Sequence, residues 1–193
     1  QNSYNETLGG GVGATYFFDN GHTGLSFAKH DQEYGNILED SAFIDLESDN
    51  FKYELEMRNL SNLVNKFKFK LSHTDYKHAE MESPTEVGLD YFDIGHDAKV
   101  ELVHSLLSES GGVAGIDFGE SRFSQHTKAY EPDNKRQNVG VYALENFTVG
   151  KHELVLGLRH DYHEYDANAF TSDDGAPTDG GTEGSTSFSA SRK

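Results

Sequence analysis

The sequence of 193 residues has no cysteine, no tryptophan and only 3 prolines. Without cysteine the chain can hold neither a disulfide framework nor a thiolate metal site, so any metal ligands must be histidine and carboxylate side chains. No run of about 18 apolar residues occurs, which excludes a transmembrane helix. A transmembrane strand needs only about 9–11 residues, of which alternate ones are apolar, so a membrane barrel remains open.

Basic residues are also scarce, since 16 Lys and Arg stand against 33 Asp and Glu, for a formal net charge of −17. A nucleic-acid partner needs a basic surface, so the charge argues against one. A polybasic anchor on an anionic membrane leaflet is disfavoured for the same reason.

The dominant pattern in the sequence is an alternation with a period of two residues, which is typical of β-strands. From residue 64 to residue 74, apolar Phe67, Phe69 and Leu71 alternate with lysines and hydroxyl residues. Residues 51–58, 114–119 and 154–162 repeat the alternation. No stretch shows a comparable apolar stripe with the helical period, so we predict an all-β chain.

The alternation predicts about nine antiparallel strands in meander order. They cover residues 4–18, 22–30, 43–59, 64–78, 89–104, 112–125, 138–148 and 152–166, with another beginning at 187. Short turns at 19–21, 60–64, 105–112 and 148–151 alternate with longer polar segments at 30–42, 76–88, 125–137 and 164–187, the last of which we expect to be flexible. Short turns on one side and long loops on the other are typical of outer-membrane barrels.

The charged face of these strands fits the lumen of such a barrel. Glu54, Glu56 and Arg58 lie in a predicted hairpin with Lys66, Lys68 and Lys70. Opposite charges on one face of paired strands attract by roughly 0.2–1 kcal/mol per pair, whereas Lys or Arg facing mid-membrane lipid costs about 2–4 kcal/mol. The alternative is a soluble sheet with one solvated face.

Several segments resemble the barrel of TonB-dependent outer-membrane receptors in order and spacing. They are residues 10–18 with 24–27, 30–35, 43–46 with 53–55, 75–80, 100–104, 115–119 and 156–159. Asp75-Tyr76-Lys77-His78-Ala79-Glu80 and Glu101-Leu102-Val103-His104 are similar to the zinc-receptor (ZnuD-like) group of that family.

The resemblance implies a transporter of the outer membrane of a Gram-negative bacterium, in contact with membrane lipid and lipopolysaccharide. The family has a 22-stranded barrel around an N-terminal plug that contacts the TonB-ExbB-ExbD complex. Residues 1–193 would then form part of the barrel, without the plug and the C-terminal strands. The implied function is uptake of zinc, with the ion as substrate and no resident cofactor, and with ligands from both plug and barrel.

Histidines and carboxylates, the ligands zinc takes when thiolates are absent, gather in three groups near the predicted outer ends of strands. His78 and Glu80 share the face of the lysines of their strand, so we expect them to form half of a metal site. Asp161 and His163 share the face of Arg159, although an Arg159–Asp161 ion pair is an alternative. The third group is His30, Asp31 and Glu33. For all three groups the competing interpretation is a set of solvated loop residues.

No nucleophile elbow, phosphate loop or His-Glu-x-x-His motif occurs, so we do not expect an enzyme. Acidic outer loops would concentrate cations at the mouth of the barrel and so favour zinc. Two other functions stay open. One is a receptor of the same architecture for an iron–siderophore or haem, and the other is a soluble secreted binding or adhesin domain.

Overall fold

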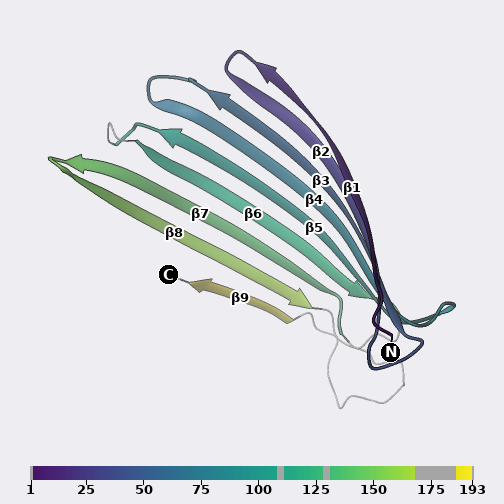
Figure 1. Cartoon of the computed structure of the whole chain (residues 1–193). Coiled ribbons are helices and arrows are strands. Elements are labelled where there is room, and N and C mark those ends of the chain that lie inside the picture. Colours follow the sequence, from purple (N-terminus) through teal and green to yellow (C-terminus); the bar gives the residue numbers. More distant parts are fainter. Residues whose placement is uncertain (1, 108–110, 128–130, 168–185, 193) are drawn as a thin grey trace.

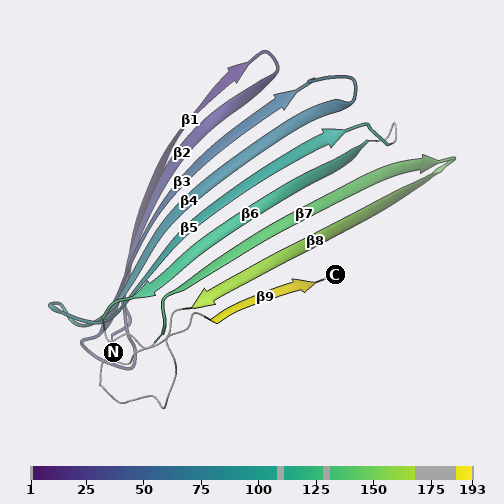
Figure 2. The same cartoon turned by 180° about the vertical axis from the view of Figure 1, so that it is seen from behind.

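The computed structural model describes residues 2–107, 111–127, 131–167 and 186–192. These residues form a single antiparallel sheet in the order β1-β2-β3-β4-β5-β6-β7-β8-β9 (Figures 1 and 2). Its strands are β1 (Asn5–Phe18), β2 (Gly21–Gly35), β3 (Phe43–Arg58), β4 (Val64–Ser83), β5 (Glu86–His104), β6 (Gly112–Gln125), β7 (Asn134–Val149), β8 (His152–Ala167) and β9 (Thr186–Arg192). The described residues include no helix long and apolar enough to cross a membrane.

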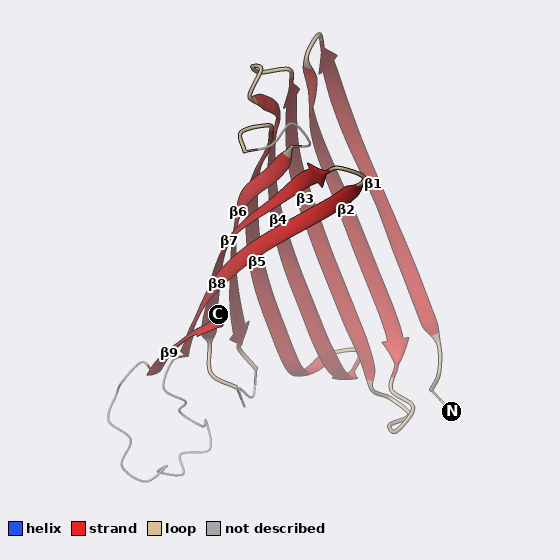
Figure 3. Ribbon diagram, turned by 90° about the vertical axis from the view of Figure 1, so that its left-hand side faces the viewer, coloured by secondary structure: helices blue, strands red, loops and turns tan. Residues whose placement is uncertain are grey.

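The sheet is an open, curved wall (Figure 3). In the part of the chain that the structure describes, β1 and β9 are its two edges and each pairs with one neighbour only. Every connection joins strands that are adjacent in the sheet, so the meander predicted from the sequence is confirmed. The all-β architecture of a barrel wall is likewise confirmed.

Several strands are longer than the sequence pattern predicted. Residues 31–35 belong to β2, residues 134–137 belong to β7, and β4 and β5 continue to a tight turn at 84–85. Polar composition suggested loops there, but backbone pairing with the neighbouring strands continues through these extensions. In Figure 1 the tip of the β4–β5 hairpin projects beyond the neighbouring loops. Most of the segment expected to be flexible, 168–185, lies outside the described residues.

The sheet has almost no core. Among the described residues only Ala42 and Ala79 are buried apolar side chains, while large apolar side chains on one face are exposed, Leu158 by 79% and Val141 by 52%. A water-soluble sheet would cover such a face. We call it the outward face, because an apolar face of this size is stable without a covering protein layer when it contacts lipid.

The apolar part of the outward face is shorter than the strands. A strand of 16 residues spans about 50 Å, whereas the apolar band of an outer-membrane barrel is about 25 Å tall. On β4 the outward side chains are apolar from Phe67 to Leu71, and three polar ones follow, at His73, Asp75 and Lys77. The sheet therefore has an apolar band next to the turns at 19–20, 59–63 and 150–151, and more polar extensions beyond it.

Replacing Phe69 by lysine tests the outward face. The ammonium group would face lipid within the band, so we expect Phe69→Lys to lower the free energy of unfolding by about 2–4 kcal/mol. Ser72→Lys is the control, because Ser72 faces the other side and bonds Asp97 at 3.2 Å. Urea unfolding of the protein in lipid vesicles measures both variants. Equal losses for the two would contradict the assignment of faces.

Candidate functional site

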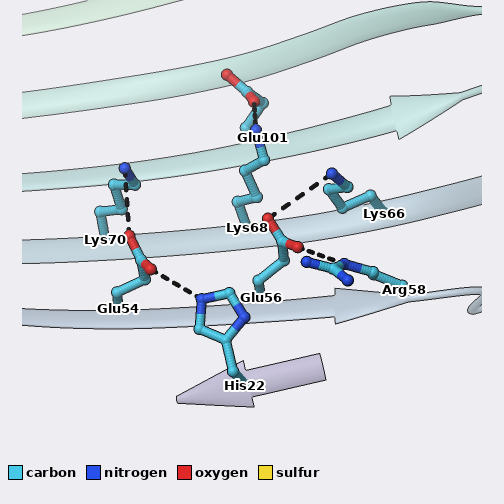
Figure 4. A network of polar contacts seen from close by, with 8 residues as sticks. All are labelled: His22, Glu54, Glu56, Arg58, Lys66, Lys68, Lys70 and Glu101. Atoms are coloured by element: carbon cyan, nitrogen blue, oxygen red, sulfur yellow. Dashed lines mark hydrogen bonds and ion pairs between the residues drawn. The ribbon is translucent and has the colours of Figure 1, made fainter. Parts of the chain in front are cut away.

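The face opposite the outward one carries a network of ion pairs over β2 to β8, part of which Figure 4 shows. Glu54 on β3 links the two neighbouring strands, with Lys70 Nζ of β4 at 3.3 Å and His22 Nε2 of β2 at 2.9 Å from its carboxylate oxygens. The side chains crowd together, as expected on the concave side of a curved sheet: Glu56 is 12% exposed and Glu101 is 17% exposed. This concave side is the luminal face.

The β3–β4 hairpin contains ion pairs between the predicted charged residues, although some of these residues pair with a partner other than the one directly opposite. Glu54 pairs directly with Lys70. Glu56 instead pairs with Arg58 on its own strand, 2.5 Å away, and with Lys66 at 3.7 Å. Lys68 turns to the next strand, where Glu101 lies 3.0 Å away (Figure 4).

Two longer bridges cross a whole strand, and each passes over a glycine. Tyr142 on β7 donates to Glu101 on β5 at 2.9 Å, and its ring lies over Gly115 of β6. In the same way Arg159 on β8 reaches across β7, over Gly140, to Asp117 on β6 at 2.9 Å and also bonds Asp161. Each charge of this network has a partner of opposite charge, so its role is to hold the luminal wall together.

Beyond the apolar band, the luminal face is hollowed into a groove of about 590 Å³, which we call the His78 groove. Its lining includes Tyr76, His78, Glu80, Tyr91, Asp93 and Phe123. β4, β5 and β6 supply these residues. His78 and Glu80 were predicted to share one face, but the aromatic residues were not predicted. The same alternation applied to residues 89–125 puts Tyr91 and Phe123 on the charged face of their strands, and the register between the strands brings them to His78 and Glu80.

His78 has one ring nitrogen engaged and one open. Its Nδ1 lies 3.2 Å from the Tyr76 hydroxyl, and Tyr91 meets the ring edge-on at a centroid distance of 5.4 Å. Its Nε2 is buried without a hydrogen-bond partner and lies 4.0 Å from Glu80 Oε1. When Nδ1–H donates to the Tyr76 oxygen, Nε2 carries the lone pair that a metal ion needs.

The other two predicted groups are arranged differently. His30 is on the luminal face of β2, whereas Asp31 and Glu33 point outward, where Asp31 lies 3.4 Å from Lys29 and Glu33 accepts a bond from Tyr4 at 2.7 Å. The alternation of the strand therefore splits this group.

Asp161 and His163 both lie on the luminal face of β8. The carboxylate of Asp161 is held by Arg159, with Nε at 2.9 Å from both of its oxygens. His163 lines a second groove, of about 560 Å³, together with Asp97, Ser121 and Asn138. Nowhere in the described ranges do three histidine or carboxylate residues meet in a way that could hold a metal ion.

The comparison with protein families decides what this wall belongs to. Residues 1–191 match the model described as TonB dependent receptor-like, beta-barrel. The chain belongs to the TonB-dependent receptor family. A comparison with curated proteins finds no match. Family membership supports a TonB-linked transporter in the outer membrane of Gram-negative bacteria, and receptors of this kind are transporters rather than enzymes.

The loop after β6 is fastened to β5 on the polar side of the apolar band. Asp90 accepts backbone N–H bonds from His126 at 3.1 Å and Thr127 at 2.5 Å, and the Phe92 and His126 rings lie 4.7 Å apart. Burial alone would raise the pKa of the Asp90 carboxyl, but these N–H groups outweigh burial and hold its pKa below the usual range.

This anchor predicts a pH dependence. Because its pKa is lower in the folded loop, Asp90 stabilises the loop above its unfolded pKa of about 3.9, and the contribution is lost as the pH falls through the lower folded value. We expect Asp90→Asn to speed amide hydrogen exchange at His126 and Thr127 at pH 7. Exchange in this variant as slow as in the parent receptor would contradict the anchor.

Gly115 supplies a test of the luminal bridges. A Cβ at this position would overlap the Tyr142 ring, so Gly115→Ala must displace the ring and break its bond to Glu101. We expect a loss of about 1–3 kcal/mol in the free energy of unfolding. Gly157→Ala is the matched control on the same face, since its Cβ would meet its nearest neighbour at 3.9 Å. Urea unfolding that shows no difference between the two variants would contradict the role of Gly115.

Proposed function

We propose that this receptor takes up zinc ions and that the His78 groove supplies part of the zinc site. The observation that carries the proposal is the open Nε2 of His78, buried beside Glu80 on the luminal face. Imidazole nitrogen and carboxylate oxygen are the ligands that zinc takes in the absence of thiolates.

His78 and Glu80 would supply two of the four ligands of a tetrahedral zinc site. The remaining ligands would come from the plug of the whole receptor, which would also carry the contact with the TonB-ExbB-ExbD complex. A site shared between wall and plug gives the transporter a means of release, because movement of the plug separates the ligands. His163, in the second groove, and His30 are further luminal imidazoles along the same wall.

A metal chelate such as an iron–siderophore, or haem, is the second candidate substrate. Tyr76, Tyr91 and Phe123 give the His78 groove aromatic walls, which suit the planar groups of such ligands. The His78 groove has no arginine in its lining to receive an anionic chelate. The third function considered from the sequence, a soluble secreted domain, is set aside because the apolar outward face and the family match both favour a membrane barrel.

Zinc titration by calorimetry on the whole receptor in detergent distinguishes these substrates. His78→Ala and Glu80→Ala should each weaken zinc binding by about tenfold or more, as expected for the loss of a ligand. His22→Ala is the control, because His22 is also luminal but is already bonded to Glu54. Tight zinc binding that both variants retain would place the site elsewhere, and absence of zinc binding by the parent receptor would favour a chelate or haem.

A further inference from the structure

Two histidines lie side by side on the outward face, away from the luminal site. His73 on β4 and His96 on β5 are direct partners in the antiparallel register. Their ring centroids are 4.6 Å apart, and the two Nδ1 atoms are separated by 3.2 Å. Because side chains alternate along β4, His73 shares the face of Leu71, while Ser72 and Thr74 point into the lumen.

The pair lies where the apolar outward side chains of β4 give way to polar ones. On the band side its neighbours along the strands are Leu71 and Ala98, and on the other side they are Asp75 on β4 and Ile94 on β5. His73 is half-buried and His96 is exposed. Two imidazoles at this height can be reached from water and from the headgroup region of the membrane.

The spacing of the two nitrogens suits chelation. Two imidazole nitrogens bound to one tetrahedral zinc ion, each about 2.0–2.1 Å from the metal, lie about 3.3 Å apart, close to the observed 3.2 Å. Without a metal, two neutral imidazoles can share at most one proton between these Nδ1 atoms. The terminal side-chain torsion of histidine, χ2, is broadly distributed. A modest rotation of each ring about χ2 points the lone pairs of the two Nδ1 atoms at one metal position.

The carboxylate directly across the sheet from His96 is already engaged. Glu120, the β6 partner of His96, bonds Lys135 at 3.0 Å, Gln137 at 2.7 Å and Arg122 at 2.8 Å. No third histidine or carboxylate among the described residues joins the pair in a metal-binding arrangement. The site therefore has two protein ligands, and its other coordination positions are open to water.

We propose that His73 and His96 form a binding site for a divalent transition-metal ion of the imidazole-preferring class, namely copper(II), nickel or zinc, on the outer wall of the barrel. The site is separate from the luminal zinc site. His73 and His78 are on the same strand, but their side chains leave the sheet on opposite faces.

Copper(II) titration followed by electron paramagnetic resonance tests the pair in the whole receptor, free of affinity tags and carrying His78→Ala to remove the luminal ligand. We expect a bound copper ion whose spectrum shows two imidazole nitrogens. His73→Ala and His96→Ala should each lose the two-nitrogen spectrum and weaken copper binding by about tenfold or more.

His160→Ala is the matched control, because His160 lies on the same outward face of β8 opposite Val141 and without a histidine partner. It should leave the spectrum unchanged. His96→Gln keeps a polar side chain at that position and should behave like His96→Ala, which separates loss of a ligand from misfolding. A two-nitrogen spectrum that persists in either single variant, or that the parent never shows, would overturn the proposal, whatever the result of zinc titration at His78.

Discussion

The alternation of side chains along paired strands is the constraint on which this wall depends. Lipid accepts neither unpaired backbone groups nor bare charges, so the chain pairs its backbone across the sheet and, within the apolar band, sends the charges of β3, β4 and β5 to the luminal face. The luminal charges in turn lie close together and must neutralise one another. The ion pairs around Glu54 and Glu101, with the bridges that pass over Gly115 and Gly140, are the consequence.

The same constraint divides the chemistry of the histidines. His78 opens into an aromatic groove beside a carboxylate, and His73, on the same strand, stacks with His96 on the opposite face. The first position faces the lumen, and the second faces outward at the end of the apolar stretch of β4. One strand can thus supply ligands to two separate environments without any change of fold.

The fold could be predicted from the sequence wherever one face is apolar, because alternation is then visible; the strand at 112–125 is the clearest case. It could not be predicted where both faces are polar, as at residues 31–33 and 134–137, because polar residues on both faces resemble a loop. The alternation of side chains correctly put His78 and Glu80 on one face of β4. The same alternation separates His30 from Asp31 and Glu33, which had been grouped because they are close in sequence. The His73–His96 contact depends on the register between two strands, which composition does not reveal.

Cysteine scanning of β4 tests the two-faced wall most directly, because residues 1–193 contain no cysteine to interfere. Single cysteines at positions 66 to 72 of the receptor in lipid vesicles would be labelled with a water-soluble maleimide. The account predicts labelling at the even positions, which face the lumen, and protection at 67, 69 and 71, which face lipid. Uniform labelling, or labelling that does not alternate, would contradict it.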